Sequence, residues 1–306
     1  MSPLRALVVC FLAFVFSPAC RTTGDKGSDK DPKPIGDLVE RSKVPESIGK
    51  LIADLDLELN AWTRLKMTAA TAEDRNKARE LEKVIATTAH ARRGELIDQL
   101  QTGPPGNRIV VAFALGFTRD PEALSPLVAS LEDSNTDVVG NALLGLMVLG
   151  NRDAPLDRIC DLMRESSDPR VRTNAAQCLS NLVAAGAEAR NVLATARLGI
   201  SDTEPGVRTH SALMLGSLLD TESVVGLIDL VRDPVPLVSA AALHALVWIG
   251  KHQDKSKGNV ARGLAAQLET ARTPQRTQLL RALNELSGVN YGDETKKWIE
   301  WAGRLP

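Results

Sequence analysis

The stretch DPRVRTNAAQCLSNL, residues 168–182, indicates the fold class because TEPGVRTHSALMLGSL, residues 203–218, repeats its pattern. In each stretch a Val-Arg pair is followed, eight and eleven residues after the valine, by two leucines. Equivalent register positions recur at spacings of 31, 33, 36, 31 and 37 residues, at Asn107, Val138, Val171, Val207, Val238 and Gln275. A leucine lies eight residues after every one of them, at Leu115, Leu146, Leu179, Leu215, Leu246 and Leu283. Self-similarity at such a period is the signature of a repeat architecture.

The residues around each register position predict two helices per repeat. Four residues after it lies a small or aliphatic side chain, at Val111, Ala142, Ala175, Ser211, Ala242 and Leu279. These positions and the leucines share one face of a helix. Upstream lies another amphipathic segment, for instance Leu124, Leu127 and Leu131, and then a turn rich in Asp and Pro. Because one such pair cannot bury both apolar faces, neighbours have to stack. We therefore expect an all-α fold, an α-solenoid of about six helix-turn-helix repeats over residues 94–288.

The turns resemble those of the HEAT-repeat family, in which an Asp in the turn is paired with an Arg at the start of the second helix. Asp202 and Arg208, six residues apart, keep both members of this pair. The other turns keep one member: Asp133 faces Val139, Asp233 faces Ser239, and Arg108, Arg172 and Arg276 face Thr102, Ser166 and Thr270. We expect a HEAT-like solenoid whose ladder of polar pairs is largely broken. The resemblance also implies a concave face, lined by the second helices, that recognises or scaffolds proteins.

Residues 37–93 predict an N-terminal helical hairpin. One apolar stripe runs along the first helix at Ile48, Leu51, Ile52, Leu55, Leu59 and Trp62. Thr71 and Asp74 have the spacing of a capping box that opens the second helix. We expect the hairpin to pack on the solenoid and cap it, although such a stripe can also bind a partner helix or a membrane surface.

Residues 289–306 predict a C-terminal cap. Gly288 suits the end of a helix, and Asp293 suits the start of a short last helix. Trp298 and Trp301 share a face of that helix and would cover the last repeat. The alternative is that the two tryptophans form an aromatic binding platform.

Residues 1–19 have the features of a signal peptide. Arg5 precedes an eleven-residue apolar run, residues 6–16, which small residues follow. A bilayer span needs about twenty apolar residues, so this run predicts export rather than a transmembrane helix. The chain is therefore expected to leave the cytoplasm.

Cys20 directly follows Ser17, Pro18 and Ala19, and this segment resembles the lipobox of bacterial lipoproteins. The resemblance implies a lipid anchor on Cys20, and the polar residues 20–36 predict a tether. The alternative is an ordinary secretory leader with Cys20 as an incidental thiol. Arg21 is not the Asp that retains enteric lipoproteins at the inner membrane, which favours the outer membrane of a bacterial envelope.

Composition excludes several classes of protein. With 43% hydrophobic and 25% charged residues the chain is globular rather than disordered throughout. The formal charge is -1 and the basic residues are interleaved with acids, so we expect no nucleic-acid partner. Aromatic residues make up only 3%, which favours helices packed through small and aliphatic side chains.

The residues that could carry chemistry do not form a recognisable catalytic set. His90, His210, His244 and His252 lack metal-ligand spacing. None precedes a Glu, unlike the His-Glu pairs of deoxyhypusine hydroxylase, a HEAT-like enzyme family; the residues that follow them are Ala91, Ser211, Ala245 and Gln253. There is no phosphate loop and no nucleophile elbow. We therefore expect no enzyme activity, cofactor, metal or small-molecule substrate.

Cys160 and Cys178 lie on the two helices of one repeat. An exported protein could oxidise them to a disulfide, but both lie among core residues, where cysteine usually acts as a small hydrophobe.

The concave face is the candidate binding site, and the partner is expected to be a protein or peptide. Its candidate solvent-facing residues form a mixed polar strip, Arg172, Asn174, Gln177, Asn181, Arg208 and His210. The alternatives are an envelope enzyme or chromophore-lyase subunit, and a purely structural spacer.

Overall fold

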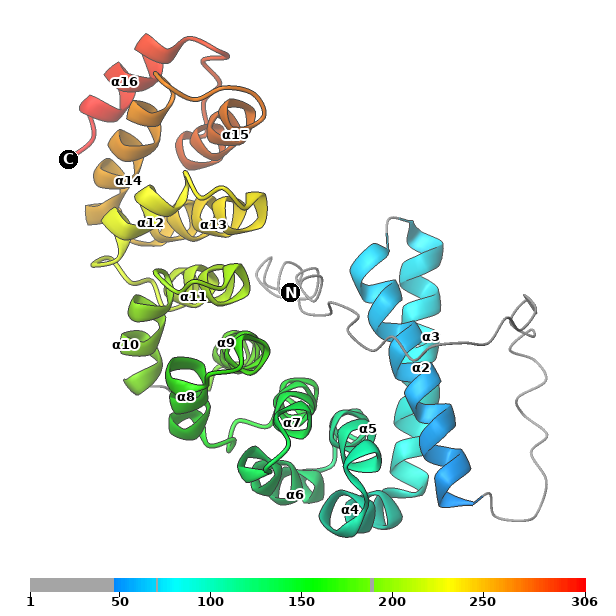
Figure 1. Ribbon diagram of the computed structural model, residues 1–306. Coiled ribbons are helices and arrows are strands. Elements are labelled where there is room, and N and C mark those ends of the chain that lie inside the picture. The colour runs from blue at the N-terminus through cyan, green and yellow to red at the C-terminus, as the bar shows by residue number, and fades with distance from the viewer. Residues whose placement is uncertain (1–46, 70, 188–189) are drawn as a thin grey trace.

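The computed structural model describes residues 47–69, 71–187 and 190–306. In these ranges the chain forms fifteen α-helices and two short 3-10 helices, without a strand. The helices stack in two layers along an arc, as expected for an all-α solenoid (Figure 1). Among these residues, no helix combines the length and the apolar character that crossing a bilayer requires. The signal peptide, Cys20 and the tether lie outside the described residues.

The inner layer of the arc consists of the second helices of the repeats (Figure 1). These are α5 (Pro105–Gly116), α7 (Thr136–Leu149), α9 (Pro169–Ala184), α11 (Pro205–Ser217), α13 (Pro236–His252) and α15 (Gln275–Ser287). Four of them begin with proline, which suits a first turn whose N–H has no helical partner. All six predicted leucines, from Leu115 to Leu283, are at most 1% exposed, so the sequence register matches the core.

The outer, convex layer holds the first helices of the repeats. These are α4 (Arg93–Thr102), α6 (Leu124–Ala129) with the 3-10 helices η3 (Pro121–Ala123) and η4 (Ser130–Glu132) beside it, α8 (Leu156–Glu165), α10 (Arg190–Gly199), α12 (Val224–Leu230) and α14 (Asp254–Gln267). Each buries one stripe against the inner layer; in α8 the stripe is Ile159, Cys160 and Met163. The two layers thus share one continuous core.

Glycines let the inner helices approach closely. A Cβ on Gly116 of α5 would lie 2.3 Å from the carbonyl oxygen of Gly145 in α7. A Cβ on Gly216 of α11 would lie 2.8 Å from the Cα of Ala245 in α13. Both contacts are with backbone, which cannot yield as a side chain would, so a larger residue at either glycine would push the two helices apart.

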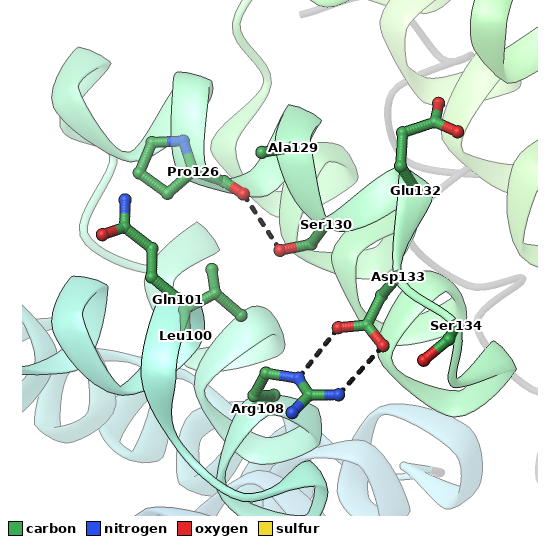
Figure 2. A pocket seen from close by; sticks show the side chains of 9 residues that line it. All are labelled: Leu100, Gln101, Arg108, Pro126, Ala129, Ser130, Glu132, Asp133 and Ser134. Carbon is green, nitrogen blue, oxygen red and sulfur yellow. Dashed lines mark hydrogen bonds and ion pairs between the residues drawn. The ribbon is translucent and has the colours of Figure 1, made fainter.

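The polar ladder that we expected to be largely broken forms between repeats, at three of the five junctions in the described residues, so that expectation is wrong. Asp202 and Arg208, the pair expected within one repeat, each bond a neighbouring repeat instead, and Arg208 reaches only the backbone carbonyl of Asp202. Arg108 makes two hydrogen bonds to Asp133 of the next repeat, at 2.8 and 3.0 Å (Figure 2). Equivalent bidentate pairs join Arg172 to Asp202 and Arg208 to Asp233. Each aspartate also accepts a backbone N–H of its own turn, from Asn135, Glu204 and Val235. The within-repeat spacing concealed the ladder because each arginine reaches forward by one repeat.

The N-terminal hairpin caps the first repeat. It consists of α2 (Ile48–Thr68) and α3 (Ala72–Ala91), and Thr71 and Asp74 form the predicted capping box. Trp62 of α2 is buried and packs edge-on against Phe117, the residue directly after α5, with ring centroids 5.0 Å apart. The apolar stripe of α2 is therefore used within the chain.

The C-terminal helix α16 (Thr295–Gly303) closes the other end of the arc. Trp298 is fully buried, and its indole N–H donates to the carbonyl of Gly292 at 3.0 Å. Arg262 of α14 donates to the carbonyl of Leu305 and fixes the chain end. Burial of Trp298 confirms the capping interpretation over an exposed aromatic platform built on this side chain.

Candidate protein-binding face

Two of the six predicted binding residues hold repeats together. The side chains of Arg172 and Arg208 are each 14% exposed and pair with Asp202 and Asp233. Each arginine also donates to a carbonyl of its own turn, that of Ser166 for Arg172. Their guanidinium groups are therefore occupied by intramolecular bonds, which makes both residues structural.

Three other predicted residues are buried, so the expectation that they face solvent is wrong for them. Asn174, Gln177 and His210 expose 6%, 2% and 3% of their surface. For Asn174 the reason is close helix packing, because its amide donates to the carbonyl of Gly140 in α7 at 3.1 Å. Asn181, one turn beyond Gln177, is half-buried and donates to the carbonyl of Gln177 at 2.9 Å.

We define the inner polar strip as Asn174, Gln177 and His210, because these residues share an unusual property. Each keeps a buried polar atom, respectively Oδ1, Nε2 and Nδ1, for which the described part of the chain supplies no hydrogen-bond partner. Asn174 and Gln177 lie three residues apart on one face of α9. His210 has the register position of Asn174 in the adjacent helix α11. Such atoms are rare in folded proteins. Others occur singly at Trp62, Gln267 and Asn284, and the strip is distinguished because three of them lie on two adjacent helices.

The inner polar strip carries no net charge at neutral pH. Burial lowers the pKa of His210 to about 4, so its ring is neutral at pH 7 and presents one donor and one acceptor. Asn and Gln side chains also present both. The strip therefore suits a neutral polar ligand group better than an ion.

A second feature of the inner face is a groove of about 300 Å³ between α13 and α15, which we call the C-terminal groove. Its lining residues are Ala240, Leu243, His244, Val247, Gln278, Arg281, Ala282 and Glu285. Sequence reasoning missed it, although a signal was present. His244 and Arg281 lie six residues after their register positions, as Gln177 does in its repeat, so the polar face could have been extended to the last repeats.

A pocket of about 360 Å³ in the outer layer, between α4 and α6, is explained by the fold (Figure 2). Its arginine and aspartate, Arg108 and Asp133, pair with each other. Those hydrogen bonds hold the pKa of Asp133 below its ordinary value. Its remaining acid, Glu132, pairs with Arg158 at 2.6 Å. The pocket therefore lies at the junction between two repeats, and its charged side chains are already paired within the chain.

Both described cysteines are free and buried. Burial raises the pKa of Cys160 and of Cys178, which keeps both thiols protonated at neutral pH. They therefore behave as the small core residues that one of the two interpretations expected. Across residues 47–69, 71–187 and 190–306, no group of three or more His, Cys, Asp or Glu side chains is arranged to hold a metal ion.

Stacked helix pairs with one continuous core define this protein as an α-solenoid. Residues 94–180 match the family described as HEAT repeats, so the protein contains a HEAT-repeat domain. No curated protein matches the chain.

Several solved structures resemble the chain in fold. A computationally designed armadillo repeat protein for modular peptide recognition shares 17% identity with a TM-score of 0.47, over 63% of this chain and 99% of that one. A designed armadillo repeat protein in complex with the peptide (KR)4 shares 14% identity with a TM-score of 0.44, over 79% and 100%. The complex of CpcE and CpcF of phycocyanin lyase from Nostoc sp. PCC7120 shares 15% identity with a TM-score of 0.41, over 85% and 100%.

Proposed function

We propose that this protein is an exported, lipid-anchored lipoprotein of a bacterial envelope whose solenoid binds or scaffolds another protein without catalysis. The observation that carries the binding part is the inner polar strip. Asn174, Gln177 and His210 each hold a buried polar atom that lacks a partner in the described residues. A buried atom of this kind costs about 1–3 kcal/mol. Because these atoms are buried in the free protein, a ligand offsets that cost by drawing the side chains toward the inner face.

A polypeptide is the ligand class that suits this strip. Every residue of a peptide main chain except proline offers one N–H donor and one C=O acceptor. The strip mixes donors and acceptors, with Nε2 of Gln177 and Oδ1 of Asn174 one helical turn apart. A polyanion such as nucleic acid would instead require clustered Lys and Arg.

The membrane part of the proposal rests on the sequence. A signal peptide at residues 1–19 is followed by Cys20 and by the polar residues 20–36. Acyl chains on Cys20 would each contribute about 0.8 kcal/mol per buried methylene, which gives stable anchoring when there are two or more. Arg21 favours the outer membrane as the destination.

Site-specific photo-cross-linking in cells tests the binding part. A photoreactive residue at Asn181, which is half-buried beside the strip, is expected to capture a partner protein. The matched control places it at Leu198 on the outer helix α10, which is 67% exposed. Identical products from the two positions, or none from Asn181, would contradict recognition by the inner face and favour a structural spacer.

Fractionation tests the anchor. Wild type is expected to sediment with the outer membrane and to incorporate a palmitate analogue. The Cys20→Ala variant should lose the label and move to the soluble fraction. A Cys20→Ala variant that still fractionates with the membrane would refute the lipid anchor while leaving the binding proposal intact.

A further inference from the structure

The C-terminal groove has an apolar floor and a polar rim. Leu243 and Val247 of α13 and Ala282 of α15 line it and are each at most 6% exposed. Arg281 and Glu285 line the α15 side and are exposed. At about 300 Å³ the groove is at the lower end of the range for ligand pockets, so it suits one or two side chains of an extended segment.

The charges along the rim do not cancel. Glu285 is neutralised by Lys251, whose ammonium lies 2.8 Å from the carboxylate. Arg281, one turn away on α15, makes no ion pair or hydrogen bond through its side chain with any described residue. Gln278, on the same stripe of α15, likewise has a side-chain amide without a bond to the described residues. The groove therefore carries one unbalanced positive charge beside an apolar floor.

We infer that the C-terminal groove binds an acidic peptide segment of the partner, in which an apolar side chain lies next to a carboxylate. The apolar side chain would cover Leu243 and Val247, and the carboxylate would take the planar fork of Arg281, which matches carboxylate geometry. Gln278 offers a donor and an acceptor to the peptide main chain. This inference rests on the proposed function and adds the chemistry of the partner.

A phage-displayed library of random peptides, panned on the full chain purified in detergent, tests the inference. Peptides recovered by wild type should be enriched in Asp or Glu next to Leu, Ile, Val, Met or Phe. Fluorescence polarisation then compares each recovered peptide with its amide analogue, in which Asn or Gln replaces the acid. The amide analogue should bind wild type about tenfold more weakly, as expected for loss of a charged hydrogen bond.

Arg281→Glu is the test variant and Arg232→Glu its matched control. Arg232 is also exposed and has no side-chain partner among the described residues, but it lies in the turn after α12, outside the groove. The recovered peptides should bind Arg281→Glu about tenfold more weakly and Arg232→Glu as tightly as wild type. Circular dichroism confirms that both variants fold.

The outcomes separate this inference from the proposed function. Peptides without an acidic preference, or with unchanged affinity for Arg281→Glu, would overturn the groove assignment. The binding proposal would then still stand if Asn181 cross-links a partner. Failure of wild type to recover any peptide, combined with no cross-link at Asn181, would overturn both.

Discussion

Two junctions between repeats use different electrostatics on the same core. Between α11 and α13, Arg208 pairs with Asp233 in a half-buried setting, with side-chain exposures of 14% and 7%. Between α7 and α9, buried Val139 replaces the arginine, and the pair that spans the junction is Arg170 with Asp137, both about half exposed. Stacking therefore requires the apolar contacts, while the half-buried bridge is an addition. Val139 at this junction, and Ser239 at the junction between α13 and α15, stand where the bridge would need an arginine.

The largest expected effect comes from truncating one core leucine at each junction. It tests whether the apolar core contributes equally to stability at both. Leu146 of α7 and Leu215 of α11 have the same register position and are at most 1% exposed. Leu146→Ala and Leu215→Ala should each lower the free energy of unfolding by about 3 kcal/mol, through lost burial and the cavity left behind. Urea unfolding followed by circular dichroism measures this. Leu198→Ala, at an exposed position, should change it by less than about 0.5 kcal/mol. A large difference between the two core variants in the free energy of unfolding would show that the core does not contribute equally at the two junctions.

A second prediction concerns how the stability of the protein depends on pH through His210 of α11. Burial lowers the pKa of His210 from 6.5 to about 4, so below pH 6.5 the unfolded chain binds a proton that the folded chain does not. Stability is therefore fully present above about pH 6.5 and falls as the pH approaches 4, by about 3 kcal/mol for this group.

The measurement compares urea unfolding of wild type and His210→Gln at several values between neutral pH and pH 4. His210→Gln removes the titration, so its stability should fall less steeply over this interval. Parallel pH profiles for the two proteins would show that His210 is not buried in its neutral form.

Removal of the half-buried pair, Arg208 with Asp233, should destabilise the protein more than removal of the exposed pair, Arg170 with Asp137. Arg208→Ala removes the ion-pair partner of Asp233, whose carboxylate has little contact with solvent. It should lower the free energy of unfolding by about 2 kcal/mol. Arg170→Ala at the other junction should cost less than about 0.5 kcal/mol, because exposed pairs are well solvated. Double-mutant cycles with Asp233→Ala and Asp137→Ala isolate each pair energy. A coupling for Arg170 and Asp137 as large as that for Arg208 and Asp233 would reverse the ranking.

The helices could be predicted from the sequence because their signals are local. The period-four apolar stripe located the inner helices, and five of the six begin two residues before the register position. The capping box at Thr71 also required only neighbouring residues. Trp298 was correctly expected in a cap because a terminal repeat has to hide its apolar face.

The candidate site was predicted less well because exposure depends on neighbouring helices. Arg172 and Arg208 belong to the ladder between repeats, and Asn174 is bonded to the backbone of α7. The C-terminal groove joins Leu243 and Arg281, which are far apart in sequence. The sequence pattern of one repeat does not predict which of its polar side chains the next repeat will bury.

The repeat period, the helix register and the identity of the core leucines could be read from the sequence alone, because the alternation of apolar and polar residues along a helix is a local property. Tertiary structure was needed to show that the ladder reaches forward by one repeat, that Gln177 and His210 are buried, and that Arg281, which has no ion-pair partner among the described residues, lies beside an apolar groove. The physical reason is that hydrogen-bond partners, desolvation and grooves are set by the distance and rotation between stacked helices, which the composition of a single helix does not encode.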